Sequence, residues 1–262
     1  EINTFKNREQ QNLQLSPLVV AAYSNGDIVV LDRNSLCFFT ISAETESIHQ
    51  STVIPQALPI KVLTQNISAT VNKNDELIVL DDRTVKIFSR NYQPLRQFNL
   101  GRQSGSKPSC IAVDDNNLIV VGYYKAGISL LKPDGSCIRR LSAPGIGSYL
   151  TTFKQQLIYT TDRKLVSIDY KGGVVFSVDI NQSGSLRGVC CDKDGSIYMC
   201  VAERIVILGL TSSIYEIHHY SPEGKYIGCI IEGCLGPRGL TFTPAGDLVI
   251  ATDNLVKIYQ HE

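Results

Sequence analysis

The chain of 262 residues contains no hydrophobic run that approaches the roughly 20 apolar residues of a membrane-spanning helix. It also lacks any stretch rich in Pro, Gly and Ser, and any block of like charges, that would separate two modules. Residues 1–262 are therefore predicted to form one domain. The 25 basic and 25 acidic side chains cancel. A net charge of zero gives no global attraction to nucleic acid or to an anionic membrane, so any such attraction must come from the local placement of charges.

Catalytic and metal-binding motifs are missing as well. The sequence has no G-x-S-x-G, H-E-x-x-H or G-x-x-x-x-G-K-S/T pattern, and none of its eight cysteines forms C-x-x-C. His218 and His219 are adjacent in an expected strand, so they should point to opposite faces and cannot share a metal. Residues 192–195 are interpreted as a turn, because Ile197 stands where a calcium loop needs Gly. We therefore predict no metal, no cofactor and no enzymatic activity, although acids from distant segments could assemble a site that no motif reveals.

Most cysteines lie inside apolar runs, where a free thiol behaves as a small buried hydrophobe. This usage favours reduced thiols and a cytoplasmic location. A secreted propeller is the rival interpretation, and Asn66 and Asn181 would then be glycosylation candidates because each begins an N-x-S sequon.

The strongest positive feature is a repeat. A polar turn opens into a short apolar β-run that ends at or near an acidic residue, and these runs begin at residues 28, 77, 118, 157, 197 and 248. A strand-rich repeat with a period in the forties is typical of a β-propeller. No stretch shows a convincing 3.6-residue apolar period. The predicted fold is therefore all-β, a six-bladed β-propeller.

The two ends of the chain are predicted to meet. The last repeat stops straight after its third strand, at Glu262, and residues 2–6 form a spare β-like segment. We expect this N-terminal strand to complete the last blade and close the ring, which would remove two exposed sheet edges. Residues 41–66 and 203–213 are long relative to the shortest repeats, so we expect them to be protruding loops.

Three segments resemble the NHL repeat, whose pattern is roughly P-x-G-V-A-V-D-x-x-G-x-I-Y-V-A-D. They are residues 186–199, residues 237–253, and residues 108–114, which match its first half. Six such repeats look like the NHL propeller of the tripartite-motif ubiquitin ligases. The resemblance implies that the chain is the C-terminal part of a longer protein and that any ligase activity resides in a RING domain outside it. It also implies binding of single-stranded RNA through one loop face, as in several NHL propellers.

Basic and aromatic residues gather at the loops expected on one face of the ring. Cations follow each signature strand or precede each first strand, and two tyrosines lie among them. The candidate RNA-binding residues are Arg33, Arg83, Tyr123, Tyr124, Lys125, Arg163, Lys164, Arg187, Arg204 and Arg238. Cations that neutralise phosphates, together with aromatic rings that stack on bases, are what single-stranded nucleic acid needs.

A structural interpretation of the same cations is equally weighted. Arg33, Arg83, Arg163 and Arg204 each follow an acidic residue in the sequence. Asp and Arg repeated in this way can form ion pairs between blades and turn caps, and the positive potential would then cancel. Arg187 and Arg238 have no adjacent carboxylate, which makes them the better candidates for ligand contact.

Three functions remain open from the sequence. The first is a non-catalytic, cytoplasmic RNA-binding domain in post-transcriptional regulation, with single-stranded RNA and regulatory or substrate proteins as partners. The second is a protein-interaction platform that recruits partners to a RING ubiquitin ligase through an apolar or mixed-charge groove. The third is an extracellular propeller enzyme or receptor module.

Overall fold

The computed structural model describes residues 5–7, 17–32, 38–41, 48–49, 67–101, 106–181, 184–207, 210–234, 236–253 and 255–261. Every regular element in these ranges is a β-strand. In the part of the chain so described, no helix is long and apolar enough to cross a membrane.

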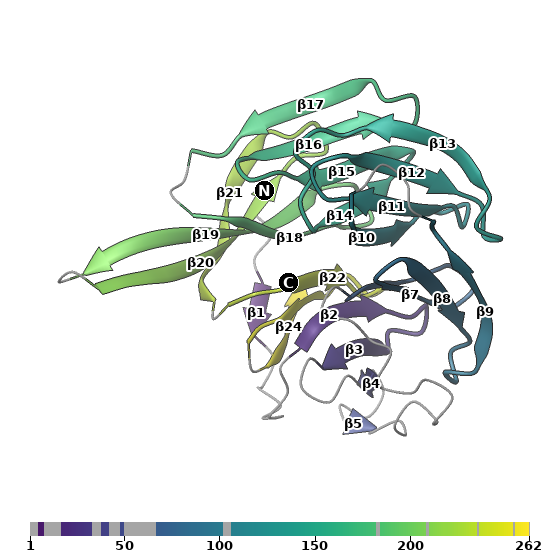
Figure 1. Ribbon diagram of the computed structural model, residues 1–262. Helices are drawn as coiled ribbons and strands as arrows, with labels where there is room; N and C mark the ends of the chain where they lie inside the picture. Colours follow the sequence, from purple (N-terminus) through teal and green to yellow (C-terminus); the bar gives the residue numbers. More distant parts are fainter. Residues whose placement is uncertain are drawn as a thin grey trace.

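The strands form six four-stranded antiparallel sheets, which are the blades of a propeller (Figure 1). Blades 1 to 3, each given from its first to its fourth strand, are β2 (Pro17–Ala22), β3 (Ile28–Asp32), β4 (Phe38–Ile41) and β5 (Ile48–His49); β6 (Ile67–Val71), β7 (Leu77–Asp81), β8 (Thr84–Phe88) and β9 (Pro94–Asn99); and β10 (Pro108–Val113), β11 (Ile119–Tyr123), β12 (Gly127–Leu131) and β13 (Cys137–Ser142).

Blades 4 to 6 follow in the same way. They are β14 (Leu150–Phe153), β15 (Gln156–Thr160), β16 (Lys164–Asp169) and β17 (Val174–Asp179); β18 (Leu186–Cys191), β19 (Ile197–Ile207), β20 (Leu210–Tyr220) and β21 (Tyr226–Cys234); and β22 (Gly239–Phe242), β23 (Leu248–Ala251), β24 (Val256–His261) and β1 (Phe5–Asn7).

The first strands of successive blades lie side by side around the centre of the ring, and β2 of blade 1 lies beside β22 of blade 6. The apolar runs explain this packing. β7 and β11 are buried at every position, because a middle strand is covered on both faces by neighbouring blades. The fourth strands β9 and β13 are mostly exposed. A near-continuous apolar run is what a strand buried on both faces requires.

Hydrophobic clusters join each blade to the next. One cluster packs Val120 and Ile128 of blade 3 against Leu157 and Tyr159 of blade 4. Equivalent clusters lie between the other neighbouring pairs, including blades 6 and 1. The core of this molecule is therefore a ring of interfaces between sheets.

The predicted closure by the N-terminal strand is confirmed. β1 pairs with β24 along the outer edge of blade 6, with Phe5 opposite His261 and Asn7 opposite Tyr259. The described strand begins at Phe5 rather than at the expected residue 2. Two segments from opposite ends of the chain thus share one sheet (Figure 1).

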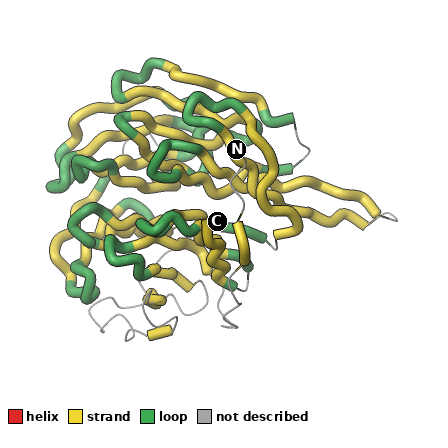
Figure 2. The backbone as a smooth tube through the Cα atoms, turned by 180° about the vertical axis from the view of Figure 1, so that it is seen from behind, coloured by secondary structure: helices red, strands yellow, loops and turns green. Residues whose placement is uncertain are grey.

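The two expected insertions have different outcomes. Residues 203–213 do protrude, but as a regular hairpin in which β19 and β20 stay paired from Ile197 and Tyr220 out to Ile207 and Leu210 (Figure 2). The expectation of a loop was wrong there, because alternating side chains on both strands allow the ladder to continue. Most of 41–66 lies outside the described residues.

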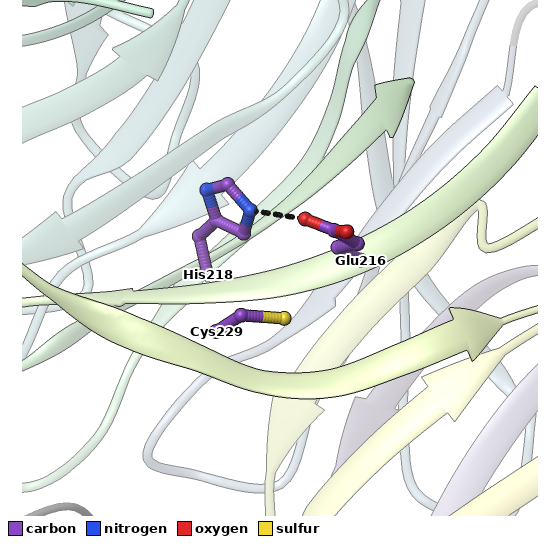
Figure 3. A group of neighbouring side chains, drawn as sticks. All are labelled: Glu216, His218 and Cys229. Carbon is purple, nitrogen blue, oxygen red and sulfur yellow. Dashed lines mark hydrogen bonds and ion pairs between the residues drawn. The ribbon is translucent and has the colours of Figure 1, made fainter. Parts of the chain in front are cut away.

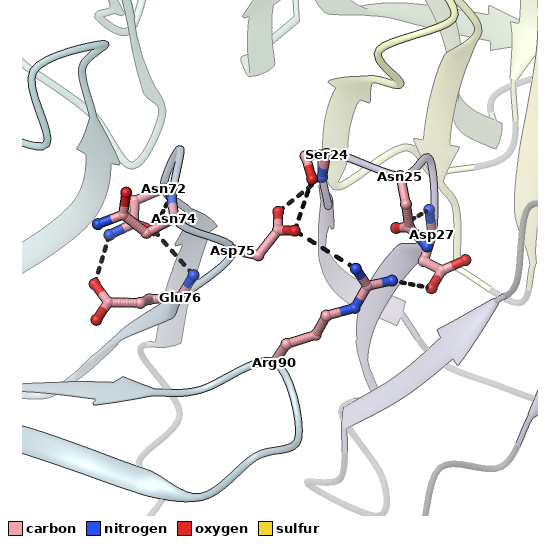
Figure 4. Close-up of polar contacts among 8 residues, drawn as sticks. All are labelled: Ser24, Asn25, Asp27, Asn72, Asn74, Asp75, Glu76 and Arg90. Atoms are coloured by element: carbon pink, nitrogen blue, oxygen red, sulfur yellow. Dashed lines mark hydrogen bonds and ion pairs between the residues drawn. The ribbon is translucent and has the colours of Figure 1, made fainter.

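Side chains at the tight turns also tie blades together (Figure 4). Arg90 of blade 2 contacts Asp27 of blade 1 at 2.5 Å and Asp75 of its own blade at 3.5 Å. The amide and the hydroxyl of Ser24 donate to Asp75 at 2.8 and 2.7 Å. These contacts lie at the turns between first and second strands and between third and fourth strands, which we call the turn face.

Candidate functional site

The opposite side of the ring is formed by the loops after each second strand and the loops before each first strand, and we call it the loop face. Backbone hydrogen bonds show that the two sets of loops meet. The amide of Lys125 donates to Ile146 at 2.8 Å, and the amide of Gly147 donates to Thr160 at 2.8 Å. Blades 3 and 4 are thus linked by their loops, which fixes the side chains that these loops carry.

Two adjoining cavities open on the loop face. One, of about 460 Å³, lies at the centre between the first strands, and its rim includes Lys107, Tyr124, Tyr149 and Arg238. The other, of about 570 Å³, lies over blades 4 and 5, and its lining includes Tyr124, Tyr149, Asp162, Arg187 and Tyr215. Because the two cavities share Tyr124, Ser148 and Tyr149, we treat them as one groove.

The two predicted tyrosines have opposite environments. Tyr123 is 5% exposed and packs in the cluster between blades 2 and 3, whereas Tyr124 is 47% exposed at the groove. The prediction that Tyr123 stacks on a ligand was therefore wrong. It is the last residue of β11, and the alternation of a strand turns its side chain into the core while its neighbour faces outward.

Lys125 is held in an ion pair between blades. Its Nζ lies 3.3 Å from Asp162 of blade 4 and 5.3 Å from the centre of the Tyr124 ring. The hydrogen bond to Asp162 and its charge raise the pKa of the Lys125 amine. The carboxylate beside the amine removes much of the positive potential that this lysine would offer to a phosphate.

Arg83 and Lys164 have mainly structural contacts. The Arg83 guanidinium donates to the carbonyls of Gly101 and Ser106 at 3.2 and 3.3 Å, so it braces the loop that leads into blade 3. Lys164 lies 3.2 Å from Asp179 of its own blade. Both side chains support backbone or neighbouring strands, which agrees with the structural interpretation of these cations.

Arg187 and Arg238 both lie at the groove, as the sequence predicts, but in different settings. Arg238 is paired with Asp253 at 2.9 Å, so a carboxylate distant in the sequence does neutralise it. Arg187 instead places its guanidinium 5.3 Å from the centre of the Tyr215 ring, at the start of β18. Arg163 is exposed in the adjoining loop.

Two predicted cations cannot be placed in the site. Arg33 lies outside the described residues. The backbone of Arg204 lies in β19 opposite Ser213, and its side chain is not among those described.

The sequence reasoning missed Tyr149 and Tyr215, which line the groove beside Arg187. Burial raises the pKa of Tyr149, and the charges of Arg187 and Arg238 oppose that increase, so both guanidinium groups lie near its hydroxyl. Tyr149 precedes the first strand of blade 4 as Arg238 precedes that of blade 6. Aligning the blades by register, rather than searching for charge alone, would have found it.

Comparison of the sequence with models of protein families and with curated proteins finds no match. Solved structures, in contrast, are similar over nearly the whole chain. A gluconolactonase from Xanthomonas campestris has a TM-score of 0.71 at 14% identity, covering 96% of this chain and 88% of that chain. A streptogramin B lyase has a TM-score of 0.66 at 14% identity, covering 98% of each chain. The WD40 β-propeller domain of Doa1 has a TM-score of 0.58 at 12% identity, covering 100% of this chain and 98% of that chain.

At these identities the likeness establishes the propeller fold alone. It also corrects one expectation. We expected no enzymatic activity because no catalytic motif is present, but two of these similar structures are named as enzymes, a lyase and a lactonase. A propeller can bring catalytic groups together from different blades, and such groups form no linear motif. An activity of this chain is therefore possible.

Proposed function

We propose that the loop face is a protein-interaction surface and that the groove binds an extended segment of a partner protein. One observation carries this proposal: Lys107, Lys125 and Arg238 on this face are each paired with a carboxylate, Asp82 at 3.5 Å, Asp162 at 3.3 Å and Asp253 at 2.9 Å. Paired charges of both signs suit the mixed side chains of a polypeptide better than a uniform line of phosphates.

Arg187 is the proposed anchor for an acidic residue of the partner. Its guanidinium is stacked near the Tyr215 ring, so its orientation is fixed before binding and little side-chain entropy is lost. Tyr and Arg are the residue types that most often dominate binding energy at interfaces. Tyr124, which is exposed between the two cavities, supplies a second aromatic contact.

Single-stranded RNA is the second candidate ligand. It is supported by two pairs of cation and ring, Lys125 with Tyr124 and Arg187 with Tyr215, because each pair could neutralise a phosphate and stack a base. The resemblance to NHL repeats supports it as well. In that family context the platform would act in the cytoplasm beside a RING ubiquitin ligase domain outside this chain.

Selection of short random peptides on the immobilised domain tests the first proposal. We expect enriched sequences to contain an acidic residue and to bind the wild-type domain, while Arg187→Ala weakens binding by about 2 kcal/mol, or roughly 30-fold. Lys193→Ala is the matched control, because Lys193 is an exposed cation of the turn face. The proposal fails if no peptide is enriched, or if Arg187→Ala and Lys193→Ala bind the selected peptides equally well.

A further inference from the structure

A second site lies in blade 5, where three different metal-ligating side chains meet (Figure 3). Glu216 and His218 alternate along β20 and therefore share one face of the sheet. Cys229 of β21 lies directly opposite His218 in the antiparallel register, so its side chain is on the same face. One carboxylate oxygen, one imidazole nitrogen and the thiol sulfur all lie within 4.8 Å of one another.

The hairpin between the two strands sets this arrangement. Gly224 has a φ of 84°, a left-handed conformation that few residues other than glycine adopt, and it closes the turn after β20. The turn pairs Tyr220 with Tyr226 and, further along, His218 with Cys229. His219 points to the other face, where its ring stacks on Tyr198 at 4.5 Å. The prediction that the two histidines face opposite ways is therefore confirmed.

The His218 ring is held by groups on both of its nitrogens. Nε2 lies 2.8 Å from Oε2 of Glu216, and Nδ1 lies 3.5 Å from the hydroxyl of Tyr220. The Tyr226 ring packs edge-on against the imidazole, with ring centres 5.2 Å apart. A ligating histidine usually has its second nitrogen fixed by an outer partner in this way, which leaves the first nitrogen aimed at the metal.

Burial at the cluster is graded. The His218 side chain is 6% exposed, that of Glu216 is 21% exposed, and Cys229 is half-buried. The histidine thus forms the floor, and the carboxylate and the thiol lie nearer the solvent. An ion could reach the three donor atoms from outside without opening the sheet.

We propose that Glu216, His218 and Cys229 bind a zinc ion through Oε2, Nε2 and Sγ. A thiolate combined with an imidazole favours zinc over the hard cations magnesium and calcium. Tetrahedral bonds of about 2.0–2.3 Å place ligand atoms roughly 3.3–3.8 Å apart, a spacing that small side-chain rotations reach from the observed arrangement. Three protein ligands leave the fourth position to water.

This site is independent of the proposed function, because none of its three residues lines the groove on the loop face. Bound zinc would join β20 to β21 at the base of the protruding hairpin. A sequence search misses the site because Glu216-x-His218 is too short a pattern to be specific, and Cys229 enters only through the register of the hairpin.

Titration of chelator-treated protein with zinc in a calorimeter tests the proposal, and cobalt(II) serves as a spectroscopic probe. We expect one zinc per chain, and with cobalt a near-ultraviolet absorption from charge transfer between thiolate and metal. Cys229→Ser should abolish that absorption and weaken zinc binding at least about 100-fold, since loss of an outer partner alone costs about 10–100-fold. Zinc should also raise the Tm of the wild-type protein but not that of the variant.

Three further variants sharpen the result. Cys137→Ser removes an exposed thiol of β13 and should leave both signals unchanged. Tyr220→Phe should weaken zinc binding about 10-fold by freeing Nδ1. Glu216→Gln decides the matter if circular dichroism shows that Cys229→Ser is unfolded. Absence of saturable zinc binding by the wild-type protein, or undiminished affinity in a folded Glu216→Gln or Cys229→Ser variant, would overturn the proposal.

Discussion

Tyr123 and Tyr124 differ in what surrounds them, and this difference separates stability from binding at the scale of single residues. Tyr123 is buried at 5% exposure among residues such as Leu80 and Ile111. Tyr123→Ala should therefore lower the free energy of unfolding by about 3–5 kcal/mol through lost burial and a cavity. Tyr124→Ala should change it by less than about 0.5 kcal/mol. Urea denaturation of both variants checks this, and equal losses would show that Tyr123 is not a core residue.

A single carboxylate at a turn provides a test by pH. Two backbone amides, those of Lys171 and Gly173, donate to Asp169 at 2.8 Å each and lower the pKa of its carboxyl. A folded-state pKa below the unfolded value of about 3.9 means that the charged form stabilises the fold above that pH. The contribution is lost as the pH falls through the folded-state pKa.

The matching variant is Asp169→Asn, which keeps an acceptor oxygen but does not titrate. We expect the wild-type protein to be the more stable of the two near pH 6, and the gap to narrow as the pH falls toward about 3.5. Urea midpoints of both proteins across this range provide the measurement. A gap that stays constant or widens on acidification contradicts the assignment.

The candidate site was only partly predictable from single residues. Arg187, Arg238 and Tyr124 do lie at the groove, because loop positions adjacent to strands follow directly from the repeat. The partners of the cations could not be foreseen. The Asp162 carboxylate pairs with Lys125 across a blade interface rather than with its neighbour Arg163, and such pairing depends on how the sheets pack.

At the scale of strands, the closure of the last blade has a measurable consequence. Three residue pairs join β1 to β24, and at about 0.2–1 kcal/mol each they contribute roughly 1–3 kcal/mol. Removal of residues 1–7 should lower the Tm by several degrees and expose the edge of β24 to association. Calorimetry and size-exclusion chromatography check both effects.

The hairpin of blade 5 supplies the control for this truncation. Replacing residues 204–213 by an Asn-Gly turn shortens β19 and β20 beyond the body of the blade but exposes no new sheet edge. This variant should stay monomeric and lose less stability than the N-terminal truncation. If the truncated protein remains monomeric with an unchanged Tm, β1 does not close the ring.

Strands were the most predictable elements, because a run such as 77–81 is buried on both faces and therefore apolar throughout. The regular hairpin at 203–213 was missed, since its extent follows from pairing with a distant strand. The same limit applies to Cys229, whose position beside His218 is a matter of register and not of sequence spacing.

At the scale of the whole molecule, the net charge of zero has a spatial explanation on the loop face. Carboxylates accompany Lys107, Lys125 and Arg238, so the face is mixed in charge rather than basic. The fold itself is shared with propellers named as enzymes and with a WD40 domain, so it does not select among functions. Function must be argued from the groove, and its paired charges are the central claim.

Fluorescence anisotropy with a randomised pool of short single-stranded RNA tests that claim most directly. The domain would be titrated at about 50 and about 200 mM salt, since phosphate contacts weaken steeply over this range. If the cations are neutralised by their partners, binding should be weak at both concentrations and should depend little on salt. Sub-micromolar binding that collapses with added salt, and that Arg187→Ala abolishes, would contradict the account and make the loop face an RNA-binding surface.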